Sequence, residues 1–235
     1  MPAFENPDAK DPSLFGVVFC ALLVALLGAL FGFDLLASIP SKPFESIADY
    51  ESALEENVKP KLLNPHYFRG ATSAPSNEWA QKRETFLNEN STTLDVNDAD
   101  INAWVASQFS QVQVSSSEGE GPKQFAVLYP PNFFIDATKG IHFNIPVEIS
   151  IPGKTVDCVL IGEGRFSSGN SPDFRLSKLS LNAASIPFPD KLCGRLLEPV
   201  FESFYGSDEF AALKDAWKKV DSVELIERGI RLNLN

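Results

Sequence analysis

The sequence predicts an α+β protein: an N-terminal transmembrane helix followed by a curved antiparallel sheet with helices packed on one face. Three observations predict this fold. Twenty apolar residues form an unbroken run at 14–33. Six apolar residues then occupy consecutive odd positions between 141 and 151. Two segments with helical apolar spacing, 190–205 and 207–220, follow the strands.

The composition sets the class of protein before any motif is considered. The chain has 235 residues, 44% hydrophobic and 22% charged, which is typical of a globular protein. Its net charge of −11 repels phosphate backbones, so we expect no nucleic-acid partner. Four segments are predicted: a short N-terminal tail at 1–13, a transmembrane anchor at 14–37, a proline-punctuated connector at 38–75 and an α+β globular domain at 76–235.

The apolar run from Leu14 to Phe33 has the length of a membrane-spanning helix. At 1.5 Å per residue it extends about 30 Å, the thickness of a hydrocarbon core. A cleaved signal peptide begins with basic residues, whereas this tail carries three acidic residues and Lys10 alone. We therefore expect a single-pass membrane protein. Lys10 before the run and Lys42 after it leave the orientation open on charge alone.

Helices and one strand are predicted between the anchor and the main strands. An acidic helix is expected at about 45–58, and a second helix at 76–87 with Ser76 as its N-cap. A short strand at 93–96 leads into a helix that Asn97 caps. One face of that helix carries Ile101, Trp104, Val105 and Phe109.

The sheet is predicted by alternation with a period of two residues. The strand at 141–151 has one dry face, and its wet face includes His142, Asn144 and Glu148. Alternation resumes at 156–166. A third strand at 174–181 shifts parity between Leu176 and Leu179, which indicates a β-bulge.

Two helices and a closing strand complete the prediction. The helix at 190–205 has a broad apolar face, and Pro199 is expected to kink it. Ser207 caps the next helix, which carries Phe210, Leu213, Trp217 and Val220. The chain ends in a strand or hairpin around Gly229.

The titratable residues follow no catalytic or metal-binding pattern. His142 and Glu148 are six positions apart on one strand, roughly 20 Å, so they cannot meet directly. Aspartates at 95, 98 and 100 lack the glycine and distal glutamate of a calcium loop and are better explained as a strand end and a helix start favoured by the helix dipole. We predict no catalytic residue, no metal, no cofactor and no enzymatic activity. Cys158 and Cys193 are expected to be buried thiols, with a disulfide as the alternative in an oxidising compartment.

The order of elements resembles a known pattern. After the anchor, the stretch Leu94 to Trp104 and the turn Ile186-Pro-Phe-Pro189 resemble bacterial single-pass, membrane-anchored proteins of unassigned function. Some of those are thought to be related to tubular lipid-binding (TULIP-like) proteins, whose curved sheet wraps a long helix around an apolar groove. The resemblance covers roughly 76–235 and implies that the soluble domain is extracytoplasmic. It transfers no catalytic residue.

The predicted function is therefore binding, of a lipid or another apolar ligand in the cell envelope. Candidate groove residues are Phe143, Ile145, Val147, Leu192, Leu196, Val200, Phe201 and Phe204. The same side chains could instead fill an ordinary core. The alternative function is a structural or adaptor protein of the envelope that docks a protein partner. A hollow groove would favour the ligand, and a filled core with an exposed apolar patch would favour the partner.

Overall fold

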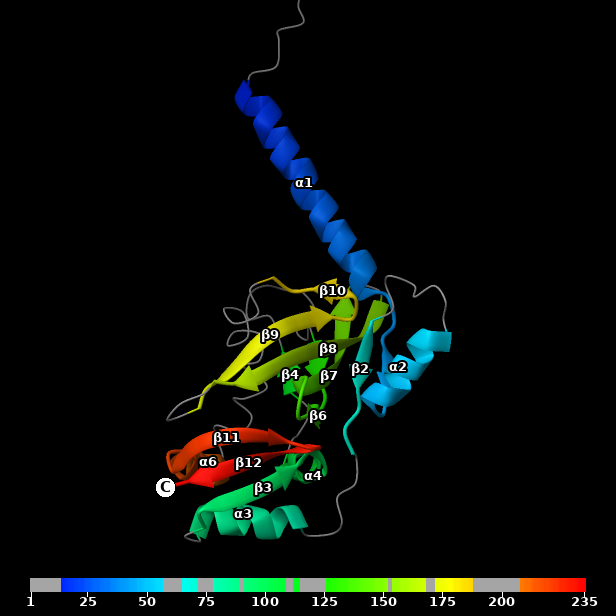
Figure 1. The fold of residues 1–235 in the computed structure, drawn as a ribbon. Coiled ribbons are helices and arrows are strands. Elements are labelled where there is room, and N and C mark those ends of the chain that lie inside the picture. Colours follow the sequence, from blue (N-terminus) through cyan, green and yellow to red (C-terminus); the bar gives the residue numbers. More distant parts are fainter. Residues whose placement is uncertain are drawn as a thin grey trace, which may run out of the picture.

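The computed structural model is a mixed α+β structure in which one long helix stands away from the remaining elements (Figure 1). It describes residues 14–56, 65–71, 78–88, 91–108, 112–114, 126–151, 154–167, 172–187 and 208–235. The predicted helix at 190–205, Phe109 and the two predicted serine caps lie outside the described residues. The predicted division into connector and domain, the curvature of the sheet and the restriction of helices to one face stay predictions.

The isolated helix is α1 (Leu14–Ala37), which coincides with the predicted anchor. Its segment Val18–Ala37 has a mean hydropathy of 2.4 and is long enough to cross a membrane. Val24 and Phe31 are 66% and 68% exposed. Keeping such apolar surface in water costs about 25 cal/mol per Å², so a lipid environment stabilises this helix. The prediction of a candidate membrane-spanning helix is confirmed.

The largest sheet is antiparallel and has seven strands in the order β10-β9-β8-β7-β5-β4, with β6 also paired to β7. Its strands are β4 (Val112–Val114), β5 (Ala126–Leu128), β6 (Asn132–Asp136), β7 (Gly140–Ile151), β8 (Lys154–Phe166), β9 (Phe174–Leu181) and β10 (Ala184–Ser185). In the long β7–β8 hairpin, Ile145 pairs with Leu160. The three strands predicted from alternation are confirmed.

The parity shift in β9 is the β-bulge that the sequence predicted. The pairing of β8 with β9 changes register between Glu163 and Gly164. Ser177 is the extra residue on β9. Because of it, Leu176 and Leu179 both reach the core, where they are 5% and 2% exposed.

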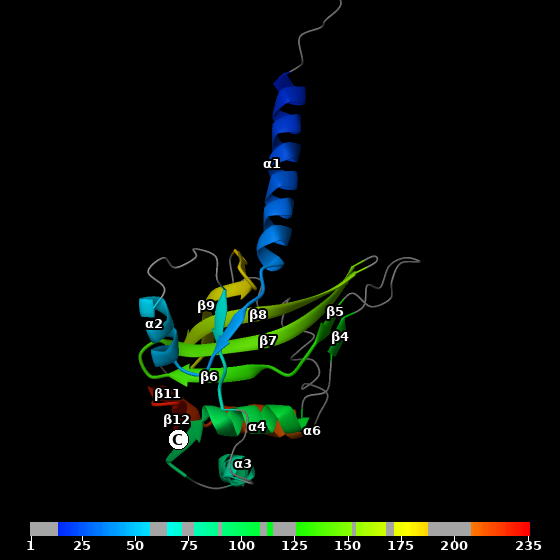
Figure 2. The same ribbon diagram turned by 90° about the vertical axis from the view of Figure 1, so that its right-hand side faces the viewer.

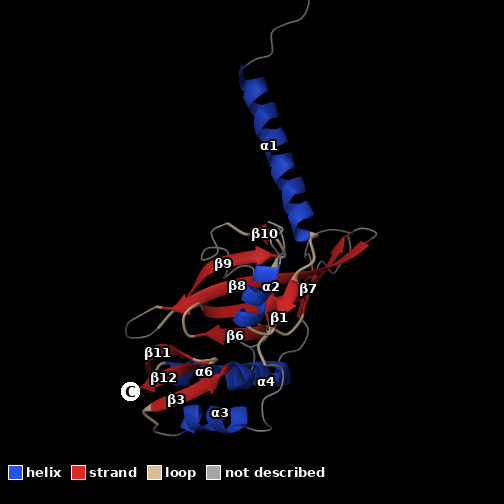
Figure 3. Ribbon diagram, turned by 45° about the vertical axis from the view of Figure 1, so that its right-hand side comes forward, coloured by secondary structure: helices blue, strands red, loops and turns tan. Residues whose placement is uncertain are grey.

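A second layer lies on the side of the large sheet opposite α1 (Figures 2 and 3). Its antiparallel sheet has the order β11-β12-β3, formed by β11 (Val220–Ile226), β12 (Gly229–Leu234) and β3 (Thr93–Asn97). Its helices are α3 (Glu78–Asn88), α4 (Asp98–Gln108) and α6 (Asp208–Trp217). In Figure 2, α4 and α6 lie next to the large sheet and α3 lies farthest from α1.

The end of α6 corrects one prediction. Val220 was expected on this helix, but α6 ends at Trp217 and Val220 begins β11. The chain turns at Lys219, whose backbone N–H donates to the carbonyl of Ala216. Val220 is 3% exposed and pairs with Leu234, so burial in the strand outweighs the helical spacing.

Two buried clusters hold the layers together. The first joins the large sheet to α4 and contains Val105, Leu128, Phe143, Ile145, Leu160, Leu176 and Leu179. The second joins the two sheets to α3 and α6 and contains Phe86, Leu94, Ile135, Ile141, Ala216, Val220, Ile230 and Leu232. Burying each large aliphatic or aromatic side chain contributes about 1.5–3 kcal/mol, so these clusters are the main source of stability.

The region predicted as a connector also contributes structure. It contains β1 (Lys42–Phe44), α2 (Ile47–Glu56) and β2 (His66–Phe68), with β1 and β2 parallel. Phe68 stacks on Phe134, and its ring centroid is 5.1 Å from that of His142. The carbonyl of Phe68 accepts a 3.0 Å hydrogen bond from Asn144 Nδ2. His142 and Asn144 are consequently buried, and the prediction that they lie on a wet face is wrong because β2 covers them.

The end of α1 is fixed to the large sheet by Asn182. This side chain is 3% exposed, and its Nδ2 donates to the carbonyl of Ala37 at 2.5 Å. Its Oδ1 accepts from Ser41 Oγ and from the N–H of Val159, both at 2.9 Å. Cys158 is buried beside the same carbonyl, and burial raises the pKa of its thiol. Cys193 lies outside the described residues, so its pairing stays a prediction.

Candidate functional site

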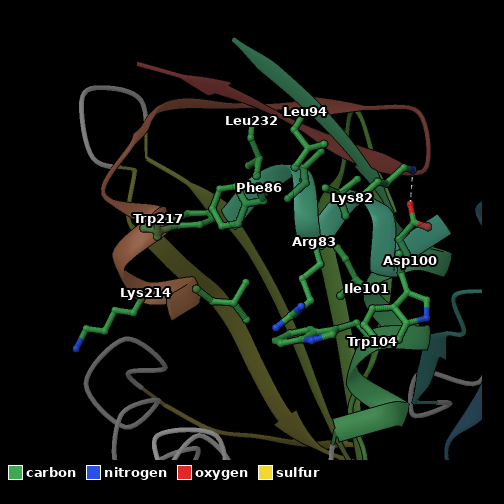
Figure 4. Close-up of a pocket in the computed structure, with 14 residues that line it drawn as sticks. Lys82, Arg83, Phe86, Leu94, Asp100, Ile101, Trp104, Lys214, Trp217 and Leu232 are labelled. Atoms are coloured by element: carbon green, nitrogen blue, oxygen red, sulfur yellow. Dashed lines mark hydrogen bonds and ion pairs between the residues drawn. The ribbon is translucent and has the colours of Figure 1, made fainter. Parts of the chain in front are cut away.

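A cavity of about 430 Å³ lies in the second layer, between α3, α4, α6 and the second sheet (Figure 4). Its lining is mainly apolar and comprises Trp79, Phe86, Leu94, Val96, Ile101, Trp104, Leu213, Trp217, Ile230 and Leu232. Its charged lining residues are Lys82, Arg83, Asp100 and Lys214. Small-molecule sites have volumes of about 300–1,000 Å³ and similar linings, so both size and chemistry fit a ligand.

The spacing of the lining residues along each helix and strand explains why they face the same cavity. On α3, Trp79, Lys82, Arg83 and Phe86 are separated by three, one and three positions and therefore share one face. On the strands, Leu94 and Val96 of β3, and Ile230 and Leu232 of β12, each lie two positions apart and point to the same side. Two helical turns of α3 thus place two aromatic rings and two cations in one cavity.

All three tryptophans of the chain line the cavity. Trp79 is on α3, Trp104 on α4 and Trp217 on α6, and each side chain is partly buried. The ring of Trp217 also packs against Phe166 of β8, with a centroid distance of 5.7 Å. Tryptophan offers a large apolar surface with a polar N–H, which suits it to a binding wall.

Asp100 connects the cavity to the start of α4. Its N–H donates to Asn97 Oδ1 at 2.8 Å, and Asn97 N–H donates back to Asp100 Oδ2 at 3.1 Å. This reciprocal pair confirms Asn97 as the helix cap. Lys82 Nζ lies 2.5 Å from the same Oδ2, and the Asp100 side chain is only 1% exposed. The ammonium of Lys82 therefore compensates a buried carboxylate, which would be costly alone.

The two neighbouring acids have other partners. Asp95 forms a two-pronged ion pair with Arg231, with distances of 2.7 and 2.8 Å, and this hydrogen bonding lowers the pKa of Asp95. Asp98 lies 2.8 Å from Arg228 Nη2, and its burial raises its pKa against the opposing effect of the arginine. The three aspartates predicted at the strand end and the helix start thus face three different cations. Within the described segments, no group of three acidic, histidine or cysteine side chains is arranged to hold a metal.

The predicted groove residues lie elsewhere. Phe143 and Ile145 are buried in the first cluster beside Val105 of α4, and Val147 packs against that cluster. None of these three lines the cavity. The other five candidates, Leu192, Leu196, Val200, Phe201 and Phe204, lie outside the described residues. What the structure brings together is a different set of residues, contributed chiefly by α3, α4 and α6, with two residues each from β3 and β12.

The two residues considered for catalysis have separate surroundings. His142 Nδ1 lies 3.8 Å from Glu163 Oε1, and burial lowers the pKa of this histidine. Glu148 Oε2 lies 3.4 Å from the hydroxyl of Tyr129. His142 and Glu148 therefore belong to different contacts on β7.

No protein family matches this sequence, and no curated protein is significantly similar to it. The resemblance to TULIP-like proteins thus stays a prediction, and the functional conclusion depends on the geometry of the cavity.

Proposed function

We propose that this protein is a membrane-anchored, non-enzymatic binding protein that holds a small apolar ligand in the cavity of its second layer. The observation that carries the proposal is the cavity itself, with ten apolar side chains in its lining, all three tryptophans among them. Apolar surface of this kind is stabilised when a ligand removes it from water, by about 25 cal/mol per Å². A volume of about 430 Å³ limits the ligand to a small molecule or a single chain.

The candidate membrane-spanning helix supports a binding function at a membrane, for which we propose the cell envelope. Helix α1 is long and apolar enough to cross a membrane, which supports membrane attachment, and the resemblance to envelope proteins favours a domain outside the cytoplasm. A phosphatase that folds only outside the cytoplasm, fused after Asn235, is therefore expected to be active. An inactive fusion, together with an active cytoplasmic reporter at the same position, would contradict this orientation.

Tryptophan fluorescence tests the binding proposal directly. The full chain is kept in an amphipathic polymer without detergent or lipid and titrated with dodecanoate and with 1-dodecanol. At least one is expected to give a saturable change in emission, because every tryptophan lines the cavity.

A matched pair of substitutions locates the binding. Leu213→Phe adds volume at the cavity wall, whereas Leu54→Phe makes the same change on the exposed surface of α2. We expect Leu213→Phe to weaken binding at least tenfold and Leu54→Phe to leave it unchanged. Absence of a saturable signal with either compound, or equal effects of the two substitutions, would reject the proposal.

A further inference from the structure

We infer that the ligand of this cavity is a rigid, compact molecule built on flat aromatic rings, and not a lipid chain. The inference depends on the proposed binding function and extends it by naming the chemical class of the ligand.

Aromatic side chains are concentrated in the lining of the cavity. Four of its 14 lining residues are aromatic, whereas aromatic residues make up 11% of the chain. Trp79 and Phe86 come from α3, Trp104 from α4 and Trp217 from α6. In Figure 4, Trp104 and Trp217 lie at opposite sides of the view, with Phe86 between them. A ligand that enters the cavity therefore meets aromatic side chains from three helices.

Two of these rings are held in place by other residues of the protein. Trp217 packs against Phe166 of β8 with a centroid distance of 5.7 Å, and Phe166 packs edge-on against Phe174 of β9 at 5.5 Å. Phe86 is 7% exposed and belongs to the second buried cluster. This part of the wall is therefore formed before a ligand binds, and a preformed wall favours a ligand that is itself rigid.

Two of the helices that carry the rings are also tied to each other. Lys82 Nζ of α3 lies 2.5 Å from Asp100 Oδ2 of α4, and the Asp100 side chain is 1% exposed. The same oxygen accepts a hydrogen bond from the N–H of Asn97 at the start of α4. Separating α3 from α4 would leave a buried charge uncompensated, so the ion pair keeps the two helices together. The ligand must therefore match this part of the cavity, because the wall does not adapt to the ligand.

Ring contacts distinguish an aromatic ligand from an aliphatic ligand of the same size. Removal of apolar surface from water stabilises both ligands by a similar amount per unit area. An aromatic ligand also gains from offset or edge-on contacts with tryptophan and phenylalanine rings, and each such contact raises the affinity by roughly two- to tenfold. Fused rings have no rotatable bonds to immobilise, whereas a flexible chain loses this freedom when it binds.

The extent of the cavity disfavours a lipid chain. Its volume of about 430 Å³ lies in the lower part of the range of about 300–1,000 Å³ for small-molecule sites. Its lining comes from α3, α4, α6, β3 and β12, and it does not continue to Phe143 or Ile145, which are buried in the first cluster. An extended acyl chain requires a long groove, whereas a compact ring system does not.

Three primary alcohols test the class of ligand. The full chain in amphipathic polymer is titrated in a calorimeter with 2-naphthalenemethanol, with its fully saturated analogue and with 1-octanol, and titrations into the polymer alone are subtracted. We expect the naphthalene compound to bind at least fivefold more tightly than either of the others. A smaller ratio, or binding of 1-dodecanol alone, would overturn the inference but preserve the binding function. No binding of any of these four compounds would reject both.

Replacement of single rings by aliphatic side chains shows whether the wall causes the preference. Trp217→Leu is expected to reduce the ratio of the two affinities, naphthalene compound over saturated analogue, at least twofold. Phe31→Leu, on the exposed surface of α1, makes a similar change outside the cavity and is expected to leave the ratio unchanged. If Trp217→Leu does not fold, Trp79→Leu on α3 provides the same comparison. A reduction of less than twofold in the folded cavity variant would overturn the inference.

Discussion

Asn102 of α4 connects two segments that are far from it in sequence. Its Nδ2 donates to the carbonyls of Phe133 at 2.8 Å and Ala71 at 3.1 Å, and its Oδ1 accepts from the N–H of Phe133 at 2.7 Å. It thereby provides hydrogen-bond partners for the backbone of Phe133 on the edge of β6 that does not face β7. A side chain at Gly70 would overlap the carbonyl of Phe133, so glycine is required where this segment approaches.

Replacement of Asn102 by alanine is expected to lower the free energy of unfolding by about 2–3 kcal/mol, because buried backbone groups lose their partners. Asn88→Ala, on the exposed end of α3, is the matched control and is expected to change it by less than about 0.5 kcal/mol. Urea unfolding followed by tryptophan fluorescence measures both. Similar midpoints for the two variants would show that Asn102 is not a structural clamp.

His142 links stability to pH. Burial lowers its pKa from the ordinary value of 6.5; Glu163 and Asp136 oppose this effect, and Lys178 and Lys139 add to it. Between pH 6.5 and the lower pKa of the folded state, this histidine binds more protons in the unfolded chain than in the folded one. The contribution of His142 to the free energy of unfolding is therefore present above pH 6.5 and is lost as the pH falls below 6.5.

His142→Phe is expected to remove this loss, since phenylalanine fits the aromatic surroundings of Phe68 and Phe134 and cannot titrate. The free energy of unfolding, measured in urea at pH 7.5, 6.5 and 5.5, should fall less in the variant than in the original chain. His66 is present in both proteins, so its contribution cancels. If the free energy of unfolding fell equally with pH in both proteins, His142 would not be the source of this pH dependence.

At the scale of elements, short-range patterns were readable and long-range contacts were not. Alternation located β7, β8 and β9, and the parity of Leu176 and Leu179 located the bulge. The same alternation in β3 gives no partner, yet Asp95 pairs with Arg231 across the sheet. A period of two fixes which face a residue occupies but not which strand lies beside it.

The cavity was missed for a related reason. The helix expected at 76–87 already carried Trp79, Lys82, Arg83 and Phe86 on one face, yet a face that lines a cavity has the same spacing as one that fills a core. The signal that could have found it is the pair of cations within that apolar face. His142 was misplaced because the proline-rich region before residue 75 gave no sign that β2 would cover it.

The junction between α1 and the sheet is testable with Asn182→Gly. Asn182 has φ of 48°, a conformation that glycine adopts without strain, so the substitution removes the side-chain hydrogen bonds and little else. Hydrogen exchange of the peptide at 36–44 is expected to accelerate at least tenfold, while exchange in β12 stays unchanged. Unaltered exchange at 36–44 would mean that Asn182 does not fix the helix.

At the scale of the whole molecule, α1 is expected to be the only described element needed for membrane attachment. A chain that begins at Asp34 keeps the Ala37 carbonyl bonded to Asn182 but lacks most of the apolar helix. It should remain in the aqueous fraction after cell lysis, whereas the full chain should stay with membranes through alkaline carbonate extraction. Sedimentation of the shortened chain with membranes would reveal a second attachment site.

The buried contact between Asn182 and the end of α1 has a mechanical consequence. The apolar segment Val18–Ala37 of this helix has 20 residues and extends about 30 Å at 1.5 Å per residue, so we expect it to tilt in a bilayer whose hydrocarbon core is thinner than this. Because the end of α1 is joined to the large sheet by hydrogen bonds and not by a loose loop, we expect the domain to turn together with the helix. The cavity lies in the part of the domain far from α1, so we expect a tilt of the helix to move its opening the most. We therefore expect bilayer thickness to set the height and direction at which the protein presents its proposed binding site.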